Sequence, residues 1–150
     1  MKIRYKLLEH ERYEDAPFIG CLISSIDCHI NCKGCFNQHI KEYPTLIKDT
    51  AEIIQEVKNN SFNEGIILAG LEWTEQPEEM RELIDVALSV ELKVMLYTGL
   101  SENTFYERFP DIQDLNIYIK FGNYQEQNRT DHNYQHGIKL ASSNQKIREI

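Results

Sequence analysis

Long apolar runs, glycine and proline are all scarce in this sequence of 150 residues. No stretch approaches the roughly 18 apolar residues of a membrane span, and the charged N-terminal segment does not resemble a signal peptide. With 7 glycines, 4 prolines, 41% hydrophobic and 27% charged residues, the composition is typical of an ordered globular protein. We therefore expect one cytoplasmic domain, residues 1–150, large enough to bury a core.

Positive charge is also in short supply. The 16 lysines and arginines are outnumbered by 24 aspartates and glutamates, which gives a formal net charge of -8. Nonspecific nucleic-acid binding needs a basic face that displaces counterions. We therefore expect neither nucleic acid nor a membrane among the partners.

The apolar pattern alternates between short β-branched runs and segments with helical spacing. Such an order predicts an α/β fold in which a mostly parallel, curved sheet is joined by right-handed crossovers. Too few units are present for a closed barrel of eight, so we expect an open half-barrel whose functional residues lie at the carboxyl ends of the strands. The predicted strands are 19–26, 65–70, 93–99 and 115–122, and the predicted helices are 48–60, 76–90 and a short one capped by Ser101.

Two further expectations concern particular positions. Asp49 or Thr50 is the expected N-cap of the helix over 48–60, because short polar side chains cap helix N-termini. The segment 123–136 is polar and poor in aliphatic residues, which predicts an exposed loop or a mobile flap.

Three of only four cysteines stand within eight positions, in "CHINCKGC". Cys28, Cys32 and Cys35 have the spacing C-x3-C-x2-C, which can place three thiolates around one face of an iron-sulfur cube and leave the fourth iron open. A structural zinc would need a fourth ligand, such as Cys21 or one of the histidines His29 and His39. Because Cys21 lies in an apolar strand, it is expected to be a buried, inert thiol, and the two histidines are expected at the surface or behind the ligands.

These motifs resemble the radical S-adenosylmethionine (SAM) enzymes, and specifically the activating protein of anaerobic (class III) ribonucleotide reductase. The resemblance rests on the cysteine motif with "CFN", then "LAGLEW", "LYTGL", "YIKFGNYQEQ" and "GIKLASSNQKI", in that order from about residue 15 to the end. It implies a single radical SAM domain that reductively cleaves SAM at a 4Fe-4S cluster and generates a glycyl radical. The implied partners are the large subunit of the reductase and a small reductant protein such as flavodoxin.

The resemblance also implies roles for individual residues. Cys28, Cys32 and Cys35 would bind the cluster, and no catalytic residue is implied beyond them. "AGLE" occupies the place of the family's Gly-Gly-Glu motif, although Ala69 replaces its first glycine and Leu71 separates Gly70 from Glu72. The residues expected to contact SAM are Gly34, Phe36, Asn37, Gly70, Glu72, Tyr97, Thr98 and Gly99.

Several readings remain open at this stage. Another small radical SAM enzyme would fit the cysteine motif, either one like 7-carboxy-7-deazaguanine synthase or the activator of a different glycyl radical enzyme. A zinc-binding interaction module is the alternative from a different class. Trp73 can fill the core or contact a cofactor, and Asn144 and Gln145 can be structural hydrogen-bonding residues or part of a docking surface.

Overall fold

The computed structural model describes residues 1–30 and 37–150. Its strands are β1 (Lys2–Tyr5), β2 (Leu7–Arg12), β3 (Gly20–Ser24), β4 (Leu46–Asp49), β5 (Gly65–Ala69), β6 (Lys93–Tyr97), β7 (Tyr118–Phe121), β8 (Arg129–Gln135), β9 (Ile138–Ser142) and β10 (Lys146–Glu149). Its α-helices are α1 (Thr50–Asn59), α2 (Pro77–Ser89) and α3 (Glu102–Arg108). Short 3-10 helices are η1 (Gln38–Glu42), η2 (Trp73–Glu75), η3 (Pro110–Asp114) and η4 (Glu126–Asn128).

Within these residues a six-stranded sheet in the order β10-β7-β6-β5-β3-β2 forms the centre of the molecule. The four middle strands are parallel, whereas β2 and β10 pair antiparallel at the two edges. The α/β fold with a mostly parallel sheet is thus confirmed, and the predicted strands coincide with β3, β5, β6 and β7. The strand order alone does not establish the half-barrel, which stays a prediction.

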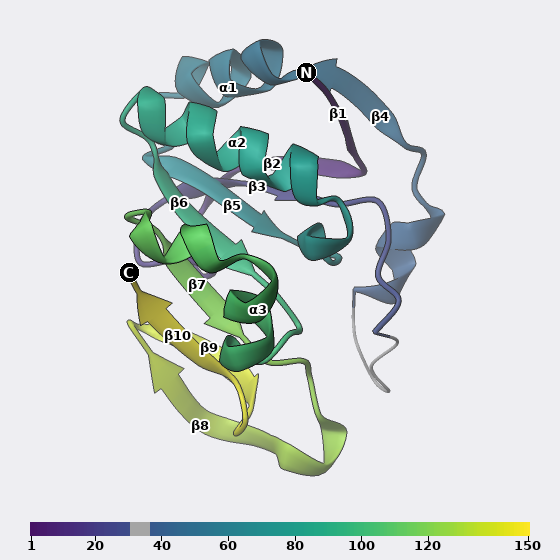
Figure 1. The fold of residues 1–150 in the computed structure, drawn as a ribbon, viewed down its shortest axis with the longest axis vertical. Helices are drawn as coiled ribbons and strands as arrows, with labels where there is room; N and C mark the ends of the chain where they lie inside the picture. Colours follow the sequence, from purple (N-terminus) through teal and green to yellow (C-terminus); the bar gives the residue numbers. More distant parts are fainter. Residues whose placement is uncertain (31–36) are drawn as a thin grey trace.

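The three α-helices cover one face of this sheet (Figure 1). Because the parallel strands follow one another in order across the sheet, right-handed crossovers carry every connecting helix to the same side. The larger core cluster lies between them and joins Ile53 of α1, Leu83 of α2 and Phe105 of α3 to strand residues such as Ile66 and Leu96. No helix in the described ranges combines the length and apolar character needed to cross a bilayer.

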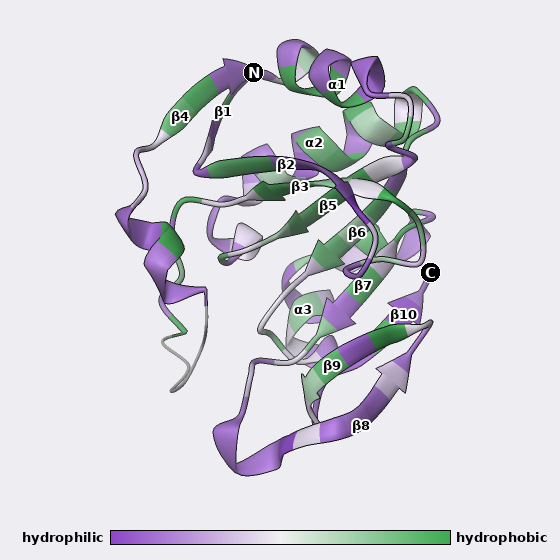
Figure 2. Ribbon diagram, turned by 180° about the vertical axis from the view of Figure 1, so that it is seen from behind, coloured by the Kyte–Doolittle hydropathy of each residue, from purple (hydrophilic) through white to green (hydrophobic). Residues whose placement is uncertain are grey.

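The opposite face of the sheet is covered only in part. A smaller apolar cluster there includes Leu22, Ile67 and Met95 from the sheet and Ile138 and Leu140 from β9. Figure 2 shows this side, with the β8–β9 hairpin standing beside the sheet and β8 coloured mainly hydrophilic. This face is therefore the one that leaves room for a cavity.

The loop predicted for 123–136 is wrong, because most of this segment is η4 and the strand β8, whereas its exposure is confirmed, since none of its residues is buried. Its polar sequence misled the prediction since the apolar side of the hairpin belongs to the partner strand β9. The β8 side chains act instead as hydrogen-bond donors: the Asn133 amide bonds the Ser142 carbonyl, and the Gln135 amide bonds the Gln145 carbonyl. The first bond joins the two strands of the hairpin, and the second attaches the hairpin to the turn before β10 at the sheet edge.

The helix beginnings agree with the sequence more closely. Asp49 is the N-cap residue of α1, but its carboxylate makes no capping hydrogen bond and instead accepts from the Lys2 ammonium at 3.0 Å. Ser101 caps α3 as predicted, since its hydroxyl accepts from the Thr104 backbone N–H at 3.3 Å.

The N-terminal strands β1 and β2, and also β4 and β10, had no counterpart in the sequence prediction.

Candidate functional site

A cavity of about 440 Å³ lies over the carboxyl ends of the parallel strands. Its floor includes Leu22 of β3 and the last residues of β5 and β6, Ala69 and Tyr97, and its walls come from β2, η1 and β9. A volume in this range suits a ligand of cofactor size. The cavity therefore stands where the α/β topology leads one to expect a binding site.

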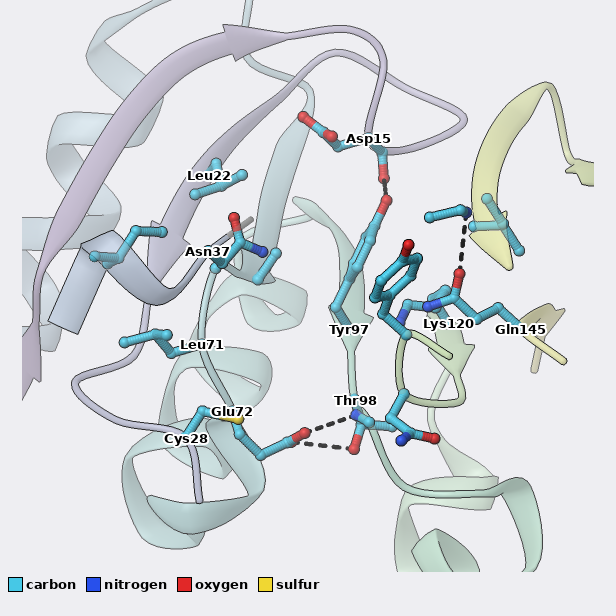
Figure 3. Close-up of a pocket in the computed structure, with 18 of the residues that line it drawn as sticks. Asp15, Leu22, Cys28, Asn37, Leu71, Glu72, Tyr97, Thr98, Lys120 and Gln145 are labelled. Atoms are coloured by element: carbon cyan, nitrogen blue, oxygen red, sulfur yellow. Dashed lines mark hydrogen bonds between the residues drawn. The ribbon is translucent and has the colours of Figure 1, made fainter. Parts of the chain in front are cut away.

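Glu72 lines the cavity with only 4% of its surface exposed, and both of its carboxylate oxygens accept hydrogen bonds. One carboxylate oxygen accepts from the hydroxyls of Thr74 at 2.8 Å and Thr98 at 3.1 Å and from the Thr74 backbone N–H at 3.2 Å. The other oxygen accepts from the Gly99 backbone N–H at 2.6 Å. Figure 3 shows Glu72 and Thr98 joined in this way, with Cys28 at the same end of the cavity. The carboxylate is held in one orientation and Glu72 lines the cavity.

Two glycines near this acid are required for different reasons. Gly70 has a φ of +93°, and a Cβ there would lie 2.6 Å from the Ser24 Cβ, so its backbone demands glycine. A Cβ on Gly99 would meet the end of the Ile30 side chain at 2.4 Å and a Glu72 carboxylate oxygen at 3.3 Å. The absence of a side chain at Gly99 therefore lets Ile30 pack against the backbone next to the acid.

Tyr97 and Lys120 lie side by side on neighbouring strands at the other part of the cavity. The Tyr97 hydroxyl donates to the Asp15 carbonyl at 2.7 Å, and burial raises the pKa of Tyr97. The Lys120 ammonium lies 5.3 Å from the centre of the Tyr97 ring and donates to the Gly122 carbonyl at 2.9 Å. Sequence reasoning missed Lys120, although a single cation between Ile119 and Phe121 in an apolar strand is a signal that could have found it.

The predicted site residues that the structure describes come together. Asn37, Gly70, Glu72, Tyr97, Thr98 and Gly99 all line the cavity, and so does the half-buried Cys28. Cys32, Gly34, Cys35 and Phe36 lie outside the described residues.

His29 and His39 each contact a neighbouring side chain. His29 is largely exposed, and both its backbone N–H and its ring bond to the Glu75 carboxylate. His39 lines the cavity rim and stacks edge-on against Tyr43. In the part of the chain that the structure describes, no three His, Cys, Asp or Glu side chains form a group suited to a metal ion.

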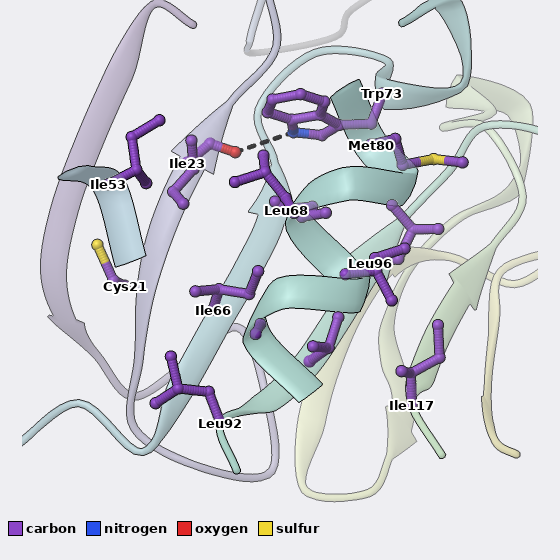
Figure 4. Close-up of a cluster of buried hydrophobic side chains, with 14 of the residues drawn as sticks. Cys21, Ile23, Ile53, Ile66, Leu68, Trp73, Met80, Leu92, Leu96 and Ile117 are labelled. Carbon is purple, nitrogen blue, oxygen red and sulfur yellow. Dashed lines mark hydrogen bonds between the residues drawn. The ribbon is translucent and has the colours of Figure 1, made fainter. Parts of the chain in front are cut away.

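Cys21 and Trp73 belong to the core and not to the cavity, as Figure 4 shows. Cys21 is completely buried on the helix-covered face, which confirms the predicted burial of its thiol, and burial raises the pKa of this thiol to about 12. Trp73, also completely buried, donates its indole N–H to the Ile23 carbonyl at 3.0 Å. Trp73 therefore fills the core.

The C-terminal residues Asn144 and Gln145 are structural hydrogen-bonding residues. The Gln145 amide oxygen accepts from the Ala141 and Ser142 backbone N–H groups, both at 3.1 Å, and its nitrogen donates to the Gly122 carbonyl. Asn144 donates to the Asn123 carbonyl at 2.9 Å. These bonds fix the turn between β9 and β10 against the loop that follows β7.

Comparison with known proteins connects this geometry to one cofactor. No curated protein matches the chain. A family model described as a 4Fe-4S single cluster domain matches residues 19–148, which includes the cysteine motif, the strand ends around the cavity and the β9 wall. Thiolates are the usual ligands of such clusters, so the donor set of the motif fits the cofactor. The match covers far more than half of the chain, and the chain therefore belongs to the family of 4Fe-4S single cluster domains.

Proposed function

We propose that this protein is a radical SAM enzyme that activates an anaerobic ribonucleotide reductase. Cys28, Cys32 and Cys35 hold three irons of a 4Fe-4S cluster, and SAM occupies the cavity beside Cys28. When bound, the cluster supplies the one electron that cleaves SAM to methionine and a 5'-deoxyadenosyl radical. The enclosing fold is then a half-barrel of the radical SAM type, acting in the cytoplasm.

The observation that carries this proposal is the convergence of independently predicted residues on one cavity. Six positions expected to contact SAM from the sequence resemblance, among them Asn37, Glu72 and Gly99, all line the same space as Cys28. They come from the N-cap of η1 and from the ends of β5 and β6, positions as much as 62 residues apart in the chain. The helices all lie on one face of the sheet, an arrangement that supports the half-barrel.

The charges of the cavity suit the amino-acid part of SAM. Among the described residues, one Glu72 oxygen accepts a single hydrogen bond, from the Gly99 N–H, and it has room for a further one from an ammonium group. The buried Lys120 ammonium lies in the same cavity and offers a positive charge for a carboxylate. A zwitterion would thus meet an opposite charge at each end.

The activase subtype is supported by where the most specific sequence segments lie. "GIKLASSNQKI", the segment that most resembles the activating proteins, provides the cavity wall from Ile138 to Ala141 and also Gln145. "YIKFGNYQEQ" provides Lys120, Asn123 and Tyr124. We infer that the large reductase subunit is the radical acceptor and that a small reductant protein such as flavodoxin supplies the electron.

Anaerobic reconstitution with iron and sulfide, followed by reduction in the presence of SAM, tests the first part of this proposal. The expected product is 5'-deoxyadenosine, formed by the parent protein and lost in Cys32→Ser. A colourless protein that binds zinc and leaves SAM intact would overturn the proposed enzyme activity and favour a zinc-binding interaction module.

Addition of the large reductase subunit to the active mixture tests the second part. A glycyl radical doublet in the electron paramagnetic resonance spectrum of that subunit is expected. If SAM is cleaved but no radical forms on the subunit, the activase is wrong and a small-molecule radical SAM enzyme or another activator takes its place.

A further inference from the structure

Both peptide groups that flank the Cys28 Cα are hydrogen-bonded on their carbonyl and N–H sides. In the preceding peptide, the Asp27 carbonyl accepts from the Glu72 backbone N–H at 3.0 Å, and the Cys28 N–H donates to the Asp27 carboxylate at 2.7 Å. In the following peptide, the Cys28 carbonyl accepts from the Lys41 ammonium at 2.6 Å, and the His29 N–H donates to the Glu75 carboxylate at 2.9 Å. Two fixed peptide planes determine φ and ψ of the residue between them, so they also determine the direction of its Cα–Cβ bond.

The two side chains that hold the second peptide come from two different elements. Lys41 belongs to η1, which follows the loop, and Glu75 belongs to η2, which follows β5. Each is itself anchored to the rest of the fold. The Lys6 ammonium donates to the carbonyls of Lys41 at 3.1 Å and Tyr43 at 2.6 Å, which ties η1 to the N-terminal strands.

Gln76, the residue after Glu75, links η2 to the chain before Cys28 and to β1. The Gln76 amide oxygen accepts from the Ile26 N–H at 2.8 Å, and its nitrogen donates to the Arg4 carbonyl at 3.0 Å. Gln76 is buried, so these bonds are shielded from water. The chain entering the cysteine motif is therefore held by β1, η1 and η2 together.

We propose that Lys41 and Glu75 are positioning residues that grip the Cys28–His29 peptide and fix the first cluster ligand for iron. Lys41 donates to the carbonyl of this peptide while Glu75 accepts from its N–H, so position 41 needs a donor and position 75 an acceptor. Groups that orient a metal ligand contribute roughly 10- to 100-fold to metal affinity. The inference rests on the proposed role of Cys28 as a ligand, but not on SAM cleavage or on the activase partner.

The experiment measures how fast an iron chelator strips the cluster from anaerobically reconstituted protein. The disruptive variants are Lys41→Met and Glu75→Ala, and the conservative ones are Lys41→Arg, which keeps a cationic donor, and Glu75→Gln, which keeps an acceptor for the His29 N–H. Lys48→Met and Glu56→Gln are matched controls, because they break a Lys–Glu pair of 3.0 Å on β4 and α1. The paramagnetic resonance spectrum of each reduced cluster is recorded in parallel, and thermal unfolding before reconstitution checks the fold.

We expect Lys41→Met and Glu75→Ala to lose iron about 10- to 100-fold faster than the parent and to show an altered cluster spectrum. The conservative and control variants should stay near the parent in both measurements. Loss at the parent rate in both disruptive variants overturns the proposal, and so does equally fast loss in Lys41→Arg or in the controls. A fall in thermal stability that accounts for faster loss without a spectral change also overturns it.

Cys28→Ser separates this proposal from the ligand assignment beneath it. If Cys28→Ser retains the cluster as the parent does, Cys28 is not a ligand and both statements fail. If Cys28→Ser loses the cluster while Lys41→Met and Glu75→Ala keep it, the assignment of Cys28 as a ligand is retained. Only the positioning role of Lys41 and Glu75 is then wrong.

Discussion

Cys21 and Cys28 are seven residues apart in the chain, yet they lie in opposite environments. Cys21 points from β3 into the apolar core under the helices, beside residues such as Ile53. Cys28 follows the end of the same strand and lines the cavity together with Glu72. The helix-covered face is held by apolar contacts, whereas the cavity end is held by hydrogen bonds to charged groups. The same side chain is therefore part of the core in one region and lines a cavity in the other.

The sharpest way to break this comparison is to exchange sulfur for oxygen in each region. Cys28→Ser should abolish cluster-dependent SAM cleavage, because two remaining thiolates are too few to anchor the cluster. Cys21→Ser should leave the activity per folded molecule unchanged and cost about 1–3 kcal/mol in unfolding free energy, since a hydroxyl would be buried in apolar surroundings. Iron content, 5'-deoxyadenosine formation and denaturant unfolding check the pair. Equal loss of iron in both variants would show that the two regions are not distinct.

Truncation of a leucine in each region compares how the two faces are stabilised. Leu68→Ala, in the core under the helices, should lower the unfolding free energy by about 2–5 kcal/mol, because a buried void remains. Leu140→Ala, in the β9 wall of the cavity, should lower it less, because the vacated volume joins the cavity. Urea unfolding of both variants measures the difference. A larger loss for Leu140→Ala would mean that the hairpin is essential to the core.

Alanine in place of the two glycines distinguishes a backbone requirement from a cavity requirement. Gly70→Ala should cost about 1–3 kcal/mol in stability, because a residue with a side chain is strained at φ +93°. Gly99→Ala should cost less stability, since the atom it meets is the flexible end of Ile30, but it should weaken SAM binding, because the new methyl displaces Ile30 and lies 3.3 Å from a Glu72 oxygen. Unfolding curves and equilibrium binding of SAM to the reconstituted proteins test both statements. Unchanged SAM binding in Gly99→Ala would remove that end of the cavity from the site.

Glu72→Ala should weaken SAM binding about 10- to 100-fold while leaving cluster assembly closer to that of the parent, because hydrogen bonds to charged groups contribute roughly 1.5–3 kcal/mol. Some stability should also be lost, since Thr74, Thr98 and Gly99 would each lose an acceptor. Binding of SAM and iron content are measured on the same preparation. A parent-like SAM affinity would show that Glu72 only braces the strand ends.

The sequence predicted one kind of feature well and another poorly, for a physical reason. Apolar runs such as 65–70 and 93–99 identify buried strands on their own, and the strand order then brings Gly70 and Thr98 to one cavity. Hydrogen bonds between distant polar groups leave no such pattern. The bonds from Thr98 to Glu72 and from Lys41 to Cys28 depend on how separate elements pack together. No local sequence pattern therefore predicts them. The polar strand β8 was missed for the same reason, because its apolar complement lies in β9.

The smallest expected effect is the pH dependence of the unfolding free energy that comes from Cys21. It tests whether water reaches the Cys21 thiol in the core. Burial raises that pKa from an ordinary 9.0 to about 12, so between these values the folded protein binds a proton that the unfolded chain releases. The contribution to stability is therefore complete below pH 9 and falls as the pH rises toward 12, by at most about 1.4 kcal/mol per pH unit. The unfolding free energy of the metal-free, reduced protein should decline more steeply between pH 8.5 and 10 than that of Cys21→Ala, as denaturant titrations at both pH values would measure. All other titrating groups are common to the two proteins, so identical slopes would mean that water reaches the thiol and that the contrast with Cys28 is one of position and not of burial.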